Sequence, residues 1–195
     1  MFDRGISGSG VVLGIDPGLS RCGYGAVRRD GQQMVPVAYG VLRTPPQDPV
    51  PQRLAQLQRD LDDLFDDLGP EALAVERVLF QVNARTAMTV GQASGLALAG
   101  AARRGIPVVQ YSPNEVKLAV TGYGAAEKEQ VQAMVTRLCN LAAPPQVDAA
   151  DALALAITHL WAGPLRADAS ITTGGGSIAP GLQRAVEAAL SKDRG

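Results

Sequence analysis

The sequence predicts an α/β protein in which helices flank a mixed five-stranded sheet. Three apolar segments at the start of the chain have strand character and follow one another without an intervening helix. Two further strand segments each come after a segment with helical character, and three more helical segments follow the last of them. Consecutive strands favour antiparallel pairing, whereas strands separated by a helix favour parallel pairing, so the pattern predicts a mixed sheet.

The first three strands are expected at residues 11–16, 23–28 and 35–43. The first is an apolar run that ends in Asp16, and Pro17 and Gly18 stop it. Asp30 and Gly31 form a typical hairpin turn between the second strand and the third. These strands therefore begin the sheet as an antiparallel unit.

Helical segments alternate with the last two strands. Leucines spaced three and four residues apart predict an amphipathic helix over residues 51–68, and its five aspartates are expected to form a solvated face. Residues 84–104 predict a long helix whose glycines and alanines allow close packing. The remaining strands are expected at 72–76 and 107–111, and the remaining helices at 113–120, 125–140 and 146–162.

The composition indicates one folded domain without a membrane span. Hydrophobic residues make up 46% of the chain, which is enough for a single core, and no apolar run reaches the ~18 residues of a spanning helix. We expect a flexible leader at residues 1–10, a folded domain at residues 11–165 and a disordered tail at residues 166–195. Cys22 and Cys139 are too isolated for a disulfide framework, so both are predicted to be buried thiols in a cytoplasmic protein.

The formal net charge of −1 hides an uneven distribution of charge along the chain. Residues 45–76 contain eight acidic and two basic residues, whereas residues 77–137 contain seven basic and three acidic residues. A basic side of the fold could face a polyanion such as DNA, although a mixed solvated surface would give the same counts.

Four carboxylates lie in apolar surroundings, where an acid is not expected. Asp16 and Glu76 each end an apolar strand. Asp148 and Asp151 are three residues apart at the start of an apolar helix, so they share one helix face. Because a buried carboxylate needs a partner, a divalent cation is a candidate partner for all four.

Each acid also has an ordinary structural interpretation. Asp16 could cap the turn that follows it, and Glu76 could pair with an arginine. Asp148 could complement the helix N-terminus, whereas Asp151 lies deeper in the apolar helix and is harder to explain in this way. Taken together, two strand ends and one helical pair can converge at one edge of a sheet, which favours a shared site.

The ligand chemistry indicates which metal such a site would hold. Oxygen ligands suit Mg²⁺ or Mn²⁺, and His159 is the only histidine of the chain, so a zinc site is not expected. Two such ions about 4 Å apart could activate a water and stabilise the leaving oxygen of a phosphodiester. The four acids therefore predict metal-dependent phosphodiester hydrolysis.

Five sequence motifs, taken in order and at their spacing, resemble the RuvC family of Holliday junction resolvases. The resemblance runs from about residue 11 to residue 162. The first motif alone is shared widely, whereas the ordered set is highly specific. The motifs are Gly14-Ile15-Asp16-Pro17-Gly18 with Gly23-Tyr24-Gly25, then Ala74-Val75-Glu76, Gly91-Gln92-Ala93, Ala126-Glu127-Lys128 and Asp148-Ala149-Ala150-Asp151-Ala152-Leu153-Ala154.

The resemblance implies a ribonuclease H-like fold and a homodimer that resolves four-way junction DNA by paired hydrolysis in recombination and repair. It also implies that the RuvA–RuvB branch-migration complex is a partner. By the same resemblance, Asp16, Glu76, Asp148 and Asp151 are the catalytic acids. These acids would hold Mg²⁺, with two ions per site, and Mn²⁺ would be a substitute.

The resemblance also implies where the protein contacts DNA. Lys117 and Lys128 match basic positions that the family uses near the DNA backbone, although both could be solvated helix lysines. Arg77 and Arg85 belong to the same basic region, and we expect them to contact DNA as well.

One position departs from the family pattern. Family members often place an aromatic residue three positions after the glutamate, in a loop that touches the unstacked junction centre. Here that position is Leu79, and the aromatic residue is the next one, Phe80. Either side chain could wedge against bases, or pack in the core, so the detail of junction opening stays undetermined by the resemblance.

Three other functions are compatible with parts of the pattern. Sugar kinases and actin-like ATPases also begin with a Gly-x-Asp-x-Gly strand, but they need a second phosphate loop and a longer chain. A YqgF-type nuclease shares the fold, but the spacing of the final acids and the long middle helix argue against it. A non-catalytic junction-binding module would be favoured by the loss of one acid, and all four are present.

Overall fold

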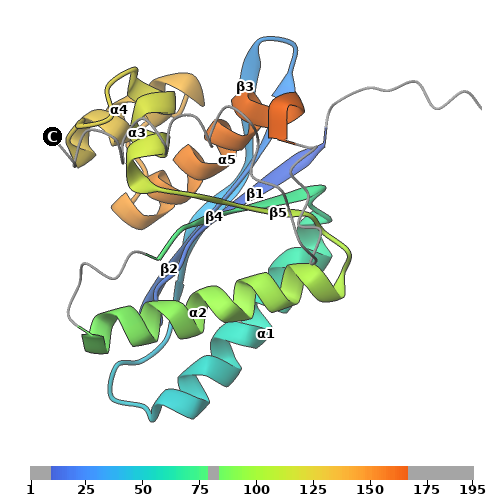
Figure 1. Cartoon of the computed structure of the whole chain (residues 1–195), viewed down its shortest axis with the longest axis vertical. Coiled ribbons are helices and arrows are strands. Elements are labelled where there is room, and N and C mark those ends of the chain that lie inside the picture. Colours follow the sequence, from blue (N-terminus) through green and yellow to red (C-terminus); the bar gives the residue numbers. More distant parts are fainter. Residues whose placement is uncertain (1–9, 79–83, 167–195) are drawn as a thin grey trace, which may run out of the picture. The chain divides into compact units, whose positions relative to one another are not determined.

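The computed structural model describes residues 10–78 and 84–166, which form five strands and five helices (Figure 1). All but the last few of these residues belong to one compact unit, Met1–Gly163. The expected leader and the expected tail lie, but for their innermost residues, outside the described ranges. The strands are β1 Val11–Asp16, β2 Arg21–Asp30, β3 Gln33–Arg43, β4 Ala72–Glu76 and β5 Val108–Tyr111. The helices are α1 Val50–Leu68, α2 Ala84–Arg103, α3 Pro113–Thr121, α4 Lys128–Leu138 and α5 Val147–Arg166.

The sheet has the strand order β3-β2-β1-β4-β5 and is mixed, as the sequence predicts. The first three strands pair antiparallel, whereas β4 pairs parallel with β1 and β5 pairs parallel with β4. In this register Asp16 lies opposite Gly23, and Ile15 lies opposite Val75. The ends of β1 and β4 and the start of β2 therefore meet at one edge of the sheet.

Most predicted elements differ from the structure by one to four residues at an end, and the differences in β2 and α4 have clear local causes. Strand β2 is longer than expected because its ladder with β3 continues to the Arg21–Arg43 pair. Helix α4 is shorter than expected. It begins after Glu127, whose side chain forms a capping box with Gln130, and it ends before Asn140, whose positive φ of 49° leaves the helical region.

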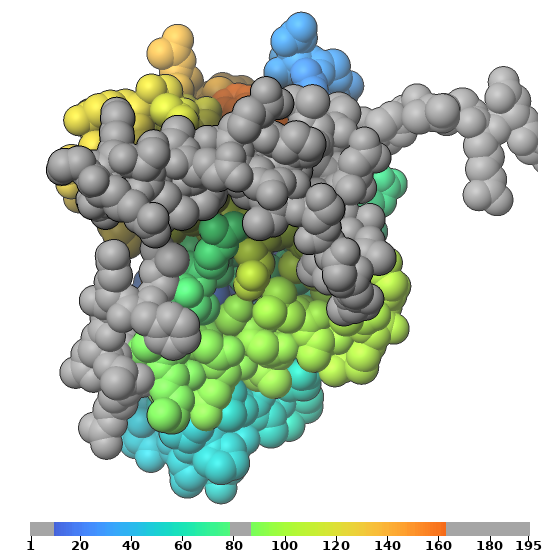
Figure 2. Space-filling view, viewed as in Figure 1, coloured from blue at the N-terminus to red at the C-terminus, as the bar shows by residue number. Residues whose placement is uncertain are grey.

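Helices cover both faces of the sheet (Figure 1). Helices α1 and α2 pack on one face, and their atoms form one continuous surface in the space-filling view (Figure 2). Helices α3, α4 and α5 lie on the other face. Each face has its own apolar core, and the described part of the chain has no helix long and apolar enough to cross a membrane. Cys22 and Cys139 are buried free thiols, as predicted.

Helix α5 lies directly on the backbone of the sheet. A Cβ atom at Gly14 of β1 would lie 1.9 Å from the carbonyl oxygen of Ala152. A Cβ atom at Gly23 of β2 would lie 2.0 Å from the carbonyl oxygen of Asp148. No side chain fits at either position, so these glycines fix the distance between α5 and the strands.

Asp63, Asp66 and Asp67 on the acidic face of α1 are exposed, as predicted, whereas Asp60 and Asp62 are partly buried. Asp62 accepts hydrogen bonds from Arg103 at 2.9 Å and from Arg104 at 2.7 Å, and Asp66 pairs with Arg104 at 2.8 Å. Arg103 and Arg104 belong to the basic region that the sequence shows at residues 77–137. In the structure they form ion pairs with aspartates of α1.

Candidate active site

The two strand-end acids lie side by side because their strands are parallel neighbours. Ile15 of β1 and Val75 of β4 are partners in the register, so Asp16 and Glu76 follow at the same edge of the sheet. Both side chains are partly buried, and the two carboxyl groups are close enough to affect each other's pKa.

Helix α5 brings the other two acids to the same place, and each is paired with a cation. Lys128, at the start of α4, lies 3.4 Å from a carboxylate oxygen of Asp151. Arg21, at the start of β2, donates a hydrogen bond of 2.7 Å from Nε to Asp148 and forms an ion pair with the same oxygen.

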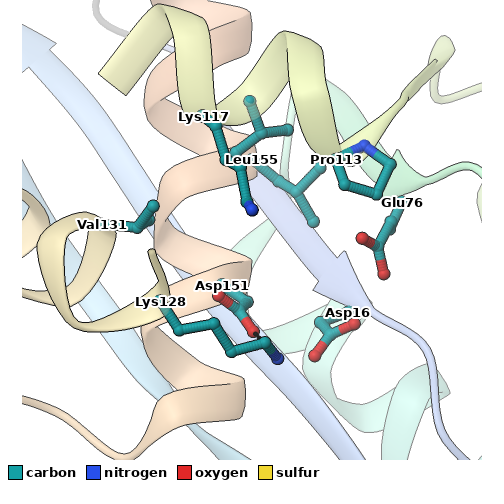
Figure 3. Close-up of a pocket in the computed structure, with 9 residues that line it drawn as sticks. Asp16, Glu76, Pro113, Lys117, Lys128, Val131, Asp151 and Leu155 are labelled. Atoms are coloured by element: carbon teal, nitrogen blue, oxygen red, sulfur yellow. Dashed lines mark hydrogen bonds and ion pairs between the residues drawn. The ribbon is translucent and has the colours of Figure 1, made fainter. Parts of the chain in front are cut away.

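Three of the four acids surround a pocket at the edge of the sheet, and Asp148 is not among the residues that line it (Figure 3). Asp16 and Glu76 face it from the sheet, Asp151 faces it from α5, and Lys117 and Lys128 reach it from α3 and α4. Its remaining walls are Pro113, Val116, Val131 and Leu155. The pocket thus combines carboxylates, which can bind a cation, with lysines, which can bind an anion such as a phosphate.

Burial and mutual repulsion raise the pKa values of Asp16, Glu76 and Asp151. Burial and the carboxylates of Glu76 and Asp151 raise the pKa of Asp16 to about 8. Burial also raises the pKa of Glu76 and the pKa of Asp151, and the Lys128 ammonium partly opposes both shifts. The Asp151 carboxylate in turn raises the pKa of Lys128. The acids thus carry more negative charge than their neighbours neutralise, and added positive charge would relieve the excess.

The predicted DNA-contacting residues divide into three groups. Lys117 and Lys128 lie in the pocket with the acids. Arg77 lines a second hollow, which also borders Asp16 and Glu76, and it donates a hydrogen bond to the Gln110 carbonyl. The remaining predicted residues, Leu79, Phe80 and the Arg85 side chain, lie outside the described residues.

Sequence analysis did not identify Arg21 as a site residue. The contact with Asp148 joins residues 127 positions apart, so no local pattern reveals it. A signal was nevertheless present in the hairpin. The β1–β2 register places Gly23 opposite Asp16, and Arg21 lies only two residues before Gly23, at the start of β2.

The residues fit a hard divalent cation in donor type and in charge. Every candidate ligand is a carboxylate oxygen, which Mg²⁺ and Mn²⁺ prefer. Within the described ranges, no three acidic, histidine or cysteine side chains already form a ligand cluster. Asp151 is turned toward Lys128, and Asp148 is turned toward Arg21. A bound metal ion would therefore replace Lys128 and Arg21 as the positive partners of these two carboxylates.

Comparisons with known proteins identify the family of the chain. The family model described as crossover junction endodeoxyribonuclease RuvC matches residues 12–159. The crossover junction endodeoxyribonuclease RuvC of Salinispora arenicola is 55% identical over 157 residues, which cover 80% of this chain and 90% of that protein.

Solved structures give the same result. The structure of T. thermophilus RuvC in complex with Holliday junction substrate is 35% identical, has a TM-score of 0.75, and covers 80% of this chain and 96% of that one. The yeast mitochondrial Holliday junction resolvase Ydc2 is 16% identical with a TM-score of 0.56, covers 80% of this chain and 81% of that one, and shows the fold alone. The predicted ribonuclease H-like fold and the predicted enzyme class are confirmed. The chain therefore belongs to the RuvC family and is a crossover junction endodeoxyribonuclease.

Proposed function

We propose that this enzyme resolves Holliday junctions by hydrolysing phosphodiester bonds at a Mg²⁺ site formed by Asp16, Glu76, Asp148 and Asp151. The observation that carries the proposal is the convergence of Asp16, Glu76 and Asp151, from two strands and one helix, on a pocket rimmed by lysines, with Asp148 one turn earlier on the same helix. The T. thermophilus RuvC that this chain resembles is described in complex with a Holliday junction, which supports the same class of substrate.

The acids and the lysines have different roles in this proposal. Asp16 and Glu76 would hold Mg²⁺, or Mn²⁺ as a substitute, from the sheet, and Asp148 and Asp151 would hold it from α5. Two bound ions would supply activation of the attacking water and stabilisation of the leaving oxygen. Lys128, which pairs with Asp151 in this structure, would be available to a DNA phosphate when Asp151 served as a metal ligand.

A cleavage assay on a synthetic four-way junction and on a matched linear duplex tests this function. We expect cuts in the junction with Mg²⁺ and none with EDTA, because the acids alone cannot activate water. Equal cutting of the linear duplex would contradict junction selectivity, and cutting in EDTA would contradict a metal mechanism.

Lys117 is expected to contact the DNA backbone. It lies in the pocket, and no ion pair in the described part of the chain includes it, so its charge is available to a phosphate. Lys117→Ala should weaken junction binding and lower the slope of log K against log salt by about 0.9, the share of one phosphate contact. Anisotropy titrations at several salt concentrations measure this slope, and an unchanged slope would remove Lys117 from the interface.

We also infer that the enzyme acts as a homodimer through the exposed face of α2. Gly91 and Gly95 lie on this face, and a Cβ atom at either position would meet no atom within 4 Å. Met88, one turn earlier, is 66% exposed, which is unusual for a large apolar side chain. A two-fold dimer offers two identical sites to a two-fold substrate, so both strands can be cut without rebinding.

Gly95→Arg is expected to produce a folded monomer. The side chain has room on the isolated chain, but a second copy of α2 could not approach it closely. Sedimentation should show a dimer for the wild type and a monomer for the variant, and a supercoiled cruciform should change from linearised to singly nicked product. Ala55→Arg, on the exposed side of α1, is the control and should stay dimeric. A dimeric Gly95→Arg protein would exclude this face.

The remaining partners follow from family membership and stay proposals. We propose that Arg77, Arg85 and the loop carrying Leu79 and Phe80 contact the junction centre. We also propose that the enzyme works in the cytoplasm with the RuvA–RuvB branch-migration complex. The two buried free cysteines agree with a reducing compartment.

A further inference from the structure

A second polar groove lies beside the four acids, where β2 begins and β3 ends. It is lined by Ser20, Arg21, Arg43, Thr44 and Gln56, together with two prolines. Arg21 and Arg43 are direct cross-strand partners, so their side chains project from the same face of the sheet. Like charges in this position repel each other, which is unfavourable unless negative charge lies nearby.

A third arginine is buried beneath the groove without an acidic partner. Arg53 of α1 is only 8% exposed. Its guanidinium donates to the hydroxyl oxygens of Thr44 at 3.0 Å and Ser20 at 2.5 Å, and both partners are neutral. None of the ion pairs in the described part of the chain includes Arg53. A buried cation with neutral partners is costly, and an anion in the groove would offset that cost.

The other two arginines leave the groove with an excess of positive charge. Arg43 donates to the neutral Gln146 side chain at 2.6 Å. Arg21 pairs with Asp148, which is one of the four candidate metal ligands. Three guanidinium groups therefore share one carboxylate, and a metal ion would compete for that carboxylate.

We propose that this groove binds a backbone phosphate of the DNA strand that lies in the active site. The proposal rests on the proposed function, since it places a second phosphate of the same strand beside the scissile one. Arg21 links the groove to the site directly, because it touches both. Ser20 accepts a hydrogen bond from Arg53, so its hydroxyl hydrogen can be donated to a phosphate oxygen.

Arg43→Gln tests the groove in the absence of cleavage. Junction binding is measured by anisotropy in EDTA over a range of salt concentrations. We expect a several-fold loss of affinity and a salt slope lower by about 0.9, as for one lost phosphate contact. Arg29→Gln is the matched control, because Arg29 is an exposed arginine near the other end of β2. Equal titrations for the two variants would overturn the proposal.

A methylphosphonate scan then separates a specific contact from general electrostatic attraction. Each phosphate near the cut is replaced in turn by an uncharged methylphosphonate. One position should weaken binding of the wild type but have no further effect on Arg43→Gln, because the contact is already lost. If every replacement affects both proteins equally, the groove makes no local contact and the proposal fails.

The failure of this proposal is distinguishable from the failure of the proposed function. A wild-type protein that binds and cuts the junction, with Arg43→Gln binding normally, removes the groove and leaves the function intact. A wild-type protein that neither binds nor cuts the junction would contradict both the groove proposal and the proposed function.

Discussion

Asp16→Asn is expected to reduce junction cleavage by about a thousandfold or more and to leave junction binding intact. The amide keeps the shape of the side chain but removes a charge that a bound metal ion needs. A thousandfold loss corresponds to about 4 kcal/mol of transition-state stabilisation, within the range that metal charge supplies. Single-turnover cleavage and anisotropy binding, on the same junction, measure the two effects separately.

The same substitution is expected to stabilise the metal-free protein. Burial and neighbouring carboxylates raise the pKa of Asp16 to about 8 in the folded state, above its value in the unfolded chain. The folded state therefore binds this proton more tightly, and stability falls as pH rises from about 4 toward 8. At about pH 9 the variant should be more stable than the wild type by roughly 5 kcal/mol, since each pKa unit corresponds to about 1.4 kcal/mol, and the difference in stability should shrink toward pH 5.

Asp30→Asn is the matched control for both measurements. Asp30 lies at the hairpin between β2 and β3, and its side chain is 68% exposed. Its substitution should change neither cleavage nor the pH dependence of stability. Full cleavage by Asp16→Asn under Mg²⁺ would remove Asp16 from the site. The same test applies to Glu76→Gln, Asp148→Asn and Asp151→Asn, each of which we expect to lose cleavage.

Gly23→Ala is the second change with a large expected effect. The added methyl group would lie 2.0 Å from the backbone carbonyl oxygen of Asp148, so α5 must move away from β2. Forcing an atom into such a contact costs about 1–3 kcal/mol of stability. The larger effect is on catalysis, because Asp148 and Asp151 move with the helix. A displacement of about 1 Å can reduce the rate by roughly 100-fold.

Gly124→Ala is the control for this experiment. A Cβ atom at Gly124 would lie 3.6 Å from its nearest neighbour, which is an ordinary van der Waals contact. Thermal melts and cleavage rates should therefore match the wild type for Gly124→Ala and fall together for Gly23→Ala. A Gly23→Ala enzyme with normal cleavage would show that α5 has freedom on the sheet that the structure does not indicate.

Local patterns in the sequence predicted most of the fold and the positions of the four acids. An apolar strand that ends in Asp16 or Glu76 is visible along the chain, and so is the i, i+3 pair on α5. The spacing of apolar residues also predicted the helices and strands, because apolar residues recur where one face of an element is buried. These signals are local, and they need no knowledge of which segments meet.

The parts that sequence analysis missed depend on contacts between distant residues. Arg21 meets Asp148 only after β2 and α5 have packed together, and Asp62 meets Arg104 only after α1 and α2 have done so. The buried position of Arg53 likewise results from the packing of α1 on the sheet. Charge counts along the chain cannot show which charges neutralise one another in the fold.

The packing of α5 against Gly14 and Gly23 has a consequence for synthesis of the enzyme. Ribosomes deliver the strands first and this helix much later, since Asp148 follows Asp16 by 132 positions in the chain (148 − 16). A nascent chain that has formed the sheet holds only half of the acids. If the four acids form the active site, as proposed, the chain can cut DNA only after the helix has emerged and docked. The proposed site is therefore completed only near the end of synthesis.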